Sequence, residues 1–183
     1  WFDEAKKKEI NDPNALALGT ASKTGIPSVR IVLLKSFDNN GFVFYTNLNS
    51  QKGNELRDNP NATMCFHWKS LLRQIRIVGT LKLVDDKTAD DYYNTRAYES
   101  RIGAWASKQS SILKNRDELL NSLENFKKKY KDQNNVPRPK YWSGWSLKPL
   151  SIEFWLDGDN RIHERLKYTK VSKGKWAKSL LSP

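Results

Sequence analysis

The chain has 183 residues, the size of one domain, and its 32 Lys and Arg against 20 Asp and Glu give a formal net charge of +12. Seven Trp, seven Tyr and seven Phe exclude a disordered chain, and no apolar run is long enough for a membrane helix. A lone cysteine, Cys65, excludes an intramolecular disulfide framework and indicates a reducing, cytoplasmic location. Because the first residue is Trp1 rather than Met, we expect the true N-terminus to lie upstream of a single domain over 1–183.

The hydrophobic pattern predicts helices and strands along the whole chain. It predicts a helix over 1–10, strands over 15–21, 26–35 and 42–47, a helix over 51–58, and strands over 62–68 and 73–84. Helices follow from Asp85 or Asp86 to Arg96, from Ser100 to Ser107 and from about Asn115 to Lys131, then a loop over 132–141 and strands over 150–156, 161–168 and 174–177. Consecutive strands joined by turns favour a mainly antiparallel barrel with peripheral helices over a doubly wound parallel sheet.

The positive charge is unevenly distributed, with a net +2 over residues 1–100 and +10 over residues 101–183. Nucleic acid, an anionic small ligand or simple solubility would each explain such an excess. Lysine runs near residues 127–131 and 167–178 carry much of it, and such runs are typical of solvated surface.

Two early segments carry groups that suit an anion. In the strand SVRIVLLK, Arg30 shares a face with Val32 and Leu34, and a guanidinium in a half-buried strand needs either a carboxylate or a bound anion. Tyr45 and Thr46 end the next strand, and Ser50 and Lys52 follow at a predicted helix start. A hydroxyl, a helix start and a cation suit a phosphate, although capped helices with a nearby Lys are common.

Two later segments add polar groups with open interpretations. Gln74 and Arg76 share a face of a central strand, where a glutamine suits a ligand ring with mixed edges or a satisfied core position. The spacing of Tyr92, Arg96 and Ser100 places all three on one face of a continuous helix, either as a second anion site or as a solvated face.

The final strands contain the most informative segment. On a strand, Arg161, His163 and Arg165 face one way and would repel one another unless an anion lay between them. Glu153 or Glu164 could instead pair with one of them, but we favour a ligand site.

Taken together, RIVLLK, FYTN, RQIRIVG, IGAWASKQSS and IEFWLDGDNRIHER resemble the pyridoxamine 5′-phosphate oxidase family in order and spacing, from about Pro13 to Pro183. The resemblance implies an FMN-binding split barrel, antiparallel and Greek-key-like, that forms a homodimer with FMN at the subunit interface. It also implies oxidation of pyridoxamine or pyridoxine 5′-phosphate by dioxygen to pyridoxal 5′-phosphate, with release of hydrogen peroxide, in vitamin B6 synthesis or salvage.

The resemblance assigns roles to the candidate residues. The FMN-binding residues it implies are Arg30, Lys35, Tyr45, Thr46, Lys52, Gln74, Gln109, Ser110, Trp155 and Arg165. The substrate-binding residues it implies are Lys35, Tyr92, Arg96, Ser100, Arg161 and His163, of which Arg161 and His163 would lie beside the reacting carbon as catalytic residues. With one cysteine and two histidines, His67 and His163, we expect no metal site.

The chain departs from the family pattern at Gln51, Leu156, Ala97-Tyr98 and Leu180, where relatives often carry Arg, Gln, Pro-Arg and Arg. Because these positions lie beside the implied ligand residues, the first could weaken an FMN-phosphate contact and the third could alter how the substrate phosphate is enclosed. Two other functions compete with the oxidase. One is a non-catalytic flavin- or haem-binding split barrel, against which both substrate groups argue, and the other is nucleic-acid binding, which no motif supports.

Overall fold

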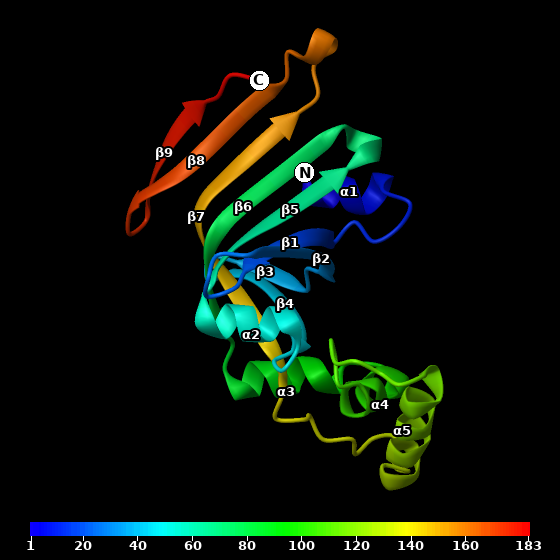
Figure 1. The fold of residues 1–183 in the computed structure, drawn as a ribbon. Coiled ribbons are helices and arrows are strands. Elements are labelled where there is room, and N and C mark those ends of the chain that lie inside the picture. The colour runs from blue at the N-terminus through cyan, green and yellow to red at the C-terminus, as the bar shows by residue number, and fades with distance from the viewer. The chain divides into compact units, whose positions relative to one another are not determined.

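The structure is a computed structural model that describes residues 1–183 (Figure 1). The chain forms two compact units. The first unit comprises Trp1–Phe44, Glu55–Lys82 and Ser146–Pro183, and the second comprises Tyr45–Asn54 and Leu83–Trp145. None of the helices combines the length and the apolar character that crossing a membrane requires.

The regular elements follow the predicted order closely. The strands are β1 (Ala15–Ala21), β2 (Pro27–Leu33), β3 (Ser36–Asp38), β4 (Gly41–Asn47), β5 (Asn61–Trp68), β6 (Arg73–Leu83), β7 (Trp142–Leu156), β8 (Glu164–Ser172) and β9 (Lys175–Leu180). The helices are α1 (Phe2–Lys8), α2 (Gln51–Asp58), α3 (Asp86–Asn94), α4 (Tyr98–Ala106) and α5 (Arg116–Lys129), with 3-10 turns η1 (Lys69–Leu71) and η2 (Asp159–Arg161).

The strands form one nine-stranded sheet in the order β2-β1-β5-β6-β7-β4-β3, and β8 and β9 extend it from β7. The pairs β1–β2, β1–β5, β3–β4, β5–β6, β7–β8 and β8–β9 are antiparallel. The predicted fold class, mainly antiparallel β with helices outside the sheet, is confirmed.

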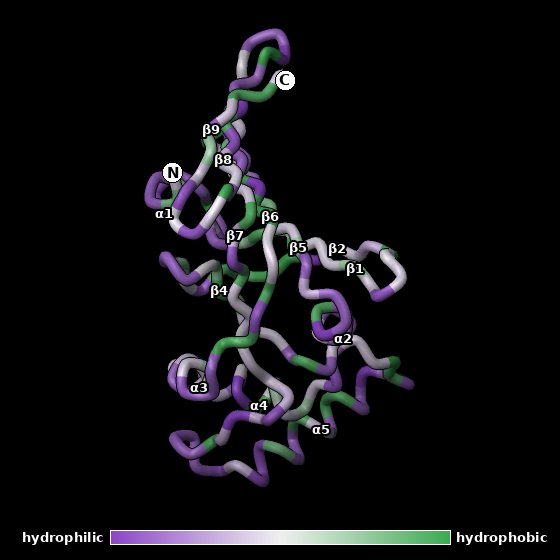
Figure 2. Tube along the Cα trace, turned by 90° about the vertical axis from the view of Figure 1, so that its left-hand side faces the viewer, coloured by the Kyte–Doolittle hydropathy of each residue, from purple (hydrophilic) through white to green (hydrophobic).

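Alternation along the strands builds the core of the first unit. Leu16 and Leu18 of β1 and Met64 and Phe66 of β5 are buried, whereas their sequence neighbours are less so. Figure 2 shows hydrophobic stretches within the strands and hydrophilic stretches in the turns. At Gly79 of β6 a Cβ would lie 2.2 Å from the Lys148 carbonyl oxygen, so the close approach of β7 requires glycine there.

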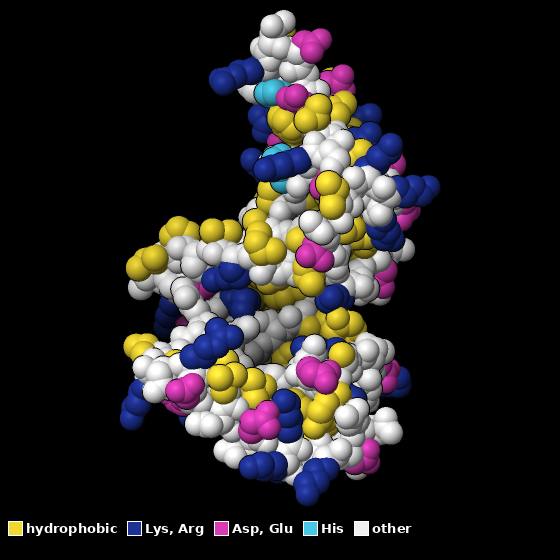
Figure 3. Space-filling view, turned by 90° about the vertical axis from the view of Figure 1, so that its right-hand side faces the viewer, with side chains coloured by type: hydrophobic (Ala, Val, Ile, Leu, Met, Phe, Trp, Pro, Cys, Tyr) yellow, Lys and Arg dark blue, Asp and Glu magenta, His cyan; other side chains and the backbone are white.

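The outer face of β2 is apolar and exposed. Val29 and Ile31 are 70% and 66% exposed, and hydrophobic side chains gather over the β1–β2 hairpin at the left of Figure 3. Arg30 and Val32 point to the opposite, less exposed side, as the alternation predicted.

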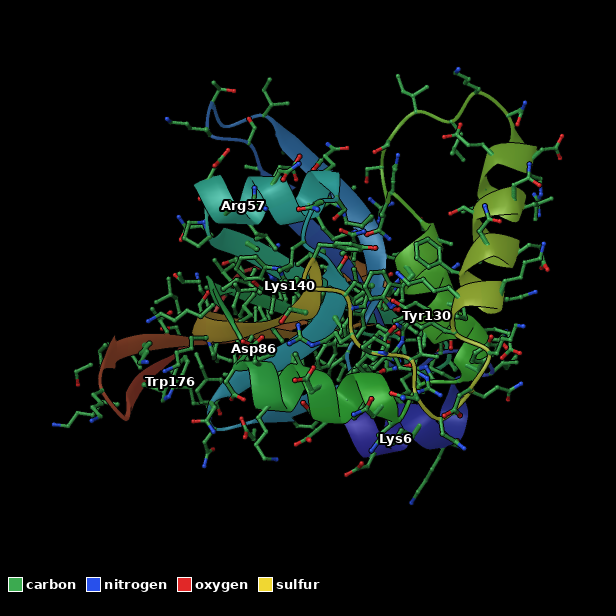
Figure 4. All side chains as sticks on the ribbon, turned by 90° about the horizontal axis from the view of Figure 1, so that it is seen from below. Lys6, Arg57, Asp86, Tyr130, Lys140 and Trp176 are labelled. Atoms are coloured by element: carbon green, nitrogen blue, oxygen red, sulfur yellow. The ribbon has the colours of Figure 1, made fainter.

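The second unit is held by polar contacts between its helices and the loop that follows α5. The Tyr98 hydroxyl donates to the Tyr130 carbonyl at 3.0 Å, and Trp105 Nε1 donates to the Pro137 carbonyl at 2.7 Å. The guanidinium of Arg138 pairs with Asp86 at 2.7 Å and with Asp90. Figure 4 labels Asp86 in α3 and Tyr130 near the end of α5.

Three local predictions were wrong. The strand predicted over 150–156 begins at Trp142 in the structure. The prediction was too short because Gly144 and Pro149 interrupt the hydrophobic pattern, although they do not end the strand. Residues 161–163 are not a strand, because Asn160 and Arg161 adopt positive φ angles of 53° and 65° in the 3-10 turn η2. The short strand β3 was not predicted, because its three residues are all exposed and show no hydrophobic alternation.

Candidate active site

A buried lysine organises the polar group at the end of β4. Lys52 is 8% exposed, and its Nζ lies 3.1 Å from Thr46 Oγ1, 3.4 Å from Ser50 Oγ and 3.0 Å from Gln109 Oε1. Ser50 Oγ also accepts the Gly53 N–H at 3.3 Å at the start of α2. Hydroxyls, an ammonium and a helix start together have the chemistry of a phosphate site.

Gln109 reaches this group from the loop after α4. Its Oε1 accepts from Thr46 Oγ1 at 3.2 Å as well as from Lys52. The next residue, Ser110, is exposed and adopts φ of 72°, a conformation that a serine rarely takes. Three predicted FMN residues of the second unit, Thr46, Lys52 and Gln109, therefore lie together in the structure, and Ser110 follows Gln109 in the chain.

The second unit also contains an aromatic stack. The Tyr45 ring stacks on Tyr92 at 4.0 Å between centroids and on Trp142 at 5.3 Å. The guanidinium of Arg96 lies over Trp142, 4.7 Å from the ring centroid. Tyr45, which the resemblance assigns to FMN, and Tyr92 and Arg96, which it assigns to substrate, thus share one aromatic platform.

Arg96 is a cation without its full set of partners. Its Nη1 is buried and has no hydrogen-bond partner. Burial lowers the pKa of Arg96, with the nearby Arg101 contributing in the same direction and Tyr93 and Tyr92 opposing it. An anion that accepted from Nη1 would offset this cost of burial.

The argument that placed Tyr92, Arg96 and Ser100 on one helical face was wrong. The helix α3 ends at Asn94 and α4 begins at Tyr98, so Arg96 lies in the connection between them. Tyr92 and Arg96 are brought together by Trp142 instead, and Ser100 is exposed near the start of α4.

In the first unit, Arg30 is bound to a carboxylate. Its Nη2 lies 3.2 Å from Glu55 Oε2 and donates to Ser28 Oγ at 2.6 Å, and its Nη1 bonds to Thr20 Oγ1. The side chain of Glu55 is 9% exposed. Of the two partners that the sequence left open for Arg30, the structure shows the carboxylate.

A second buried carboxylate, Glu153, binds two arginines. Arg165 Nε and Nη2 lie 2.9 and 2.8 Å from Glu153 Oε1, and Arg76 Nη2 lies 3.0 Å from Oε2. Gln74 is half-buried two residues before Arg76 and on the same side of β6. For Arg165, the pairing with Glu153 is the structural explanation that the sequence offered as the alternative to a ligand.

His163 and Trp155 form a separate contact in this unit. Their ring centroids lie 4.6 Å apart, and His163 Nδ1 is 3.0 Å from Asp157 Oδ1. His163 Nδ1 also accepts the Gly158 N–H at 3.3 Å, so both contacts hold the ring at Nδ1 and neither involves Nε2. Arg161 is exposed in the 3-10 turn, so the prediction that Arg161, His163 and Arg165 share one strand face was wrong.

Sequence reasoning missed two residues of these groups, Trp142 and Glu55. Trp142 gave no signal beyond its aromatic character, and its place under Arg96 is a tertiary contact. Glu55 on a predicted helix looked like an ordinary surface carboxylate. Lys35, which the resemblance assigned to both FMN and substrate, is exposed after β2 in the first unit.

Comparison with known families agrees with the fold. A family model described as pyridoxamine 5′-phosphate oxidase matches residues 2–129, and one described as the pyridoxine 5′-phosphate oxidase C-terminal dimerisation region matches residues 142–183. The chain belongs to the pyridoxamine 5′-phosphate oxidase family, which confirms the predicted resemblance and enzyme class.

Relatives resemble the chain over its full length. A pyridoxine/pyridoxamine 5′-phosphate oxidase of Pelagibacter ubique is 69% identical over 183 residues, covering 100% of this chain and 88% of that protein. The enzyme of the same name from Allorhizobium ampelinum is 52% identical, and the match covers 100% of this chain and 89% of that protein. Among solved structures, PhzG from Burkholderia lata in complex with tetrahydrophenazine-1-carboxylic acid has a TM-score of 0.92 at 30% identity, with 100% and 89% covered.

Proposed function

We propose that this chain oxidises pyridoxamine or pyridoxine 5′-phosphate to pyridoxal 5′-phosphate, using FMN and dioxygen and releasing hydrogen peroxide, in vitamin B6 synthesis or salvage. The observation that carries the proposal is Arg96, a guanidinium stacked on Trp142 with a buried Nη1 that has no partner. The phosphate common to both substrates would complete that set of hydrogen bonds. The family and its relatives support the choice of substrate.

The donor set of the second unit fits the phosphate of FMN. Lys52 supplies a positive charge, Thr46 and Ser50 supply hydroxyls, and Gln109 orients the ammonium. We keep the rest of the FMN set as part of the proposal: Arg30, Lys35, Tyr45, Gln74, Ser110, Trp155 and Arg165. Since Glu55 and Glu153 already hold Arg30 and Arg165, these two arginines would offer FMN their remaining N–H donors and little net charge.

When bound, FMN supplies the redox chemistry, because it can accept a hydride from C4′ of the substrate and be reoxidised by dioxygen. The chain supplies binding and orientation. In the proposal, Tyr92, Arg96 and Ser100 hold the substrate phosphate and Lys35 assists. Arg161 and His163 lie beside the reacting carbon, where His163 Nε2 could hold or release a proton while Asp157 fixes the ring through Nδ1.

The proposed state of the protein is a cytoplasmic homodimer with FMN at the subunit interface. The C-terminal strands belong to the family's dimerisation region. In the first unit an apolar groove of about 1150 Å³ is lined by Trp1, Phe154, Trp176 and Leu180 among others, which suits a protein surface as partner. The lone Cys65 fits a reducing compartment.

The test is spectroscopic and catalytic. Purified protein should show flavin absorbance, and added pyridoxamine 5′-phosphate should drive oxygen consumption and peroxide formation. A yellow protein without turnover would favour a non-catalytic flavin binder, and a colourless protein that FMN cannot reconstitute would reject the proposal. Arg161→Ala should reduce turnover while FMN stays bound; loss of FMN instead would show that Arg161 belongs to the cofactor set.

A further inference from the structure

A second polar pocket lies in the second unit. It has a volume of about 310 Å³ and is lined by Asn94, Arg101, Asn134, Asn135, Val136 and Pro137. Asn94 ends α3, Arg101 lies in α4, and the other four belong to the loop that follows Tyr130 (Figure 4). None of the residues assigned above to FMN or to the substrate lines it.

Arg101 is the unusual member of this lining. It is only 8% exposed, and its guanidinium makes one hydrogen bond, from Nη2 to the Gln133 carbonyl at 2.6 Å. Its Nε is buried without a partner, and no carboxylate lies within 4.0 Å of the guanidinium. Because arginine carries five N–H donors and does not lose its proton in proteins, most of its hydrogen-bonding capacity and all of its charge are uncompensated.

Arg96 apart, this contrasts with the other arginines of low exposure. Arg30, Arg73, Arg138 and Arg165 each pair with a carboxylate. Arg101 instead lies close to a second cation, Arg96, whose pKa it lowers. A buried charge without a counter-charge is costly, so its retention needs a compensating partner.

The position of Arg101 is fixed by its own backbone. The Tyr93 hydroxyl donates to the Arg101 carbonyl at 2.9 Å, and both Tyr93 and Ile102 are fully buried. A shift of α4 that exposed the Arg101 side chain to bulk water would therefore break the Tyr93 hydrogen bond and the packing of Ile102. The pocket beside it is lined by three asparagines, whose amides can donate to an oxyanion or bind its solvating water.

We propose that this pocket is a binding site for a small oxyanion, the phosphate or carboxylate group of a small molecule, with Arg101 as its counter-ion. The volume of the pocket is at the lower end of the range for ligand pockets. It would therefore hold a small molecule that carries the anionic group, and a whole nucleotide would be too large. The site is distinct from the proposed substrate-phosphate group, which comprises Tyr92, Arg96 and Ser100. Its existence does not depend on the proposed reaction.

The test uses the full chain, isotopically labelled and saturated with FMN, titrated with inorganic phosphate and separately with acetate. The signals followed by NMR are Arg101 Nε–H and the side-chain amides of Asn94, Asn134 and Asn135. We expect saturable shifts of these signals, and we expect Arg101→Gln to weaken the binding at least tenfold. Arg116→Gln, which removes the same charge from an exposed site on α5, should leave the binding unchanged.

Asn134→Ala, in the exposed loop, provides a second variant in case Arg101→Gln does not fold; it should weaken binding severalfold. Shifts with phosphate alone would assign a phosphate ligand, and shifts with acetate alone a carboxylate ligand. The proposal fails if neither anion shifts the pocket signals, or if neither pocket variant changes the affinity. Flavin content and turnover of the same preparations test the proposed reaction separately.

Discussion

Replacing Glu153 with glutamine removes one buried negative charge that serves two arginines. Its side chain is 5% exposed, whereas those of Arg165 and Arg76 are 24% and 47% exposed. Glutamine keeps the shape and one carbonyl oxygen, so the variant isolates the charge from the packing. Arg165 then keeps its bond to the Ser182 carbonyl at 2.8 Å but loses its carboxylate.

The magnitude follows from exposure. Breaking a fully buried ion pair by removing one partner costs about 3–5 kcal/mol. Water can reach Arg76 and part of Arg165, so we expect the free energy of unfolding to fall by about 2–3 kcal/mol. This is close to the cost of losing one hydrogen bond to a charged group and leaving its partner desolvated. With a urea m-value of about 2 kcal/mol/M, the unfolding midpoint should fall by about 1–1.5 M.

The assay is urea unfolding followed by fluorescence, at one fixed protomer concentration because dimerisation contributes to apparent stability. Glu164→Gln is the matched control, since Glu164 is exposed at the start of β8 and should change stability by less than about 0.5 kcal/mol. If Glu153→Gln and Glu164→Gln unfold at the same midpoint, the charge of Glu153 does not stabilise the strands as argued.

Three further predictions concern the second unit. Arg96→Lys, which loses the planar fork and the stacking on Trp142, should raise KM for pyridoxamine 5′-phosphate by about tenfold in steady-state assays, whereas an unchanged KM would remove Arg96 from the substrate site. Lys52→Met should weaken FMN binding by about tenfold or more in a fluorescence titration, with unaltered affinity as the contrary result. Tyr93→Phe, which deletes the bond to the Arg101 carbonyl, should cost about 1 kcal/mol at pH 8. Burial raises the pKa of Tyr93 to about 12, so wild-type stability should fall as pH rises from about 10 to 12, and a variant with the same decline would contradict this.

The strands were predictable because their side chains alternate in ways that only a half-buried sheet explains. Leu16 and Leu18, and Met64 and Phe66, follow that rule in β1 and β5. The exceptions are local: β7 carries Gly144 and Pro149, and Arg161 takes a left-handed conformation that no periodicity reveals.

The site was only partly predictable, for a different reason. The residue types were visible, but their partners come from distant segments. The sequence could not show that Glu55 holds Arg30 across 25 positions, or that Trp142 lies under Arg96. Helical spacing predicted that Tyr92 and Arg96 lie together on one helix face. In the structure both contact the ring of Trp142 instead. The ligand roles carried by the family resemblance stay predictions.

The two compact units share their secondary structure. The chain passes from one unit to the other four times, between residues 44 and 45, 54 and 55, 82 and 83, and 145 and 146. Every crossing falls inside a regular element, namely β4, α2, β6 and β7. No contiguous fragment therefore consists of one unit alone, because residues 45–145, which contain the whole second unit, also carry residues 55–82 of the first. A cut between the units would therefore break a strand or a helix. Split-protein reporters or domain swaps would have to cut within a loop of one unit instead, such as residues 107–115.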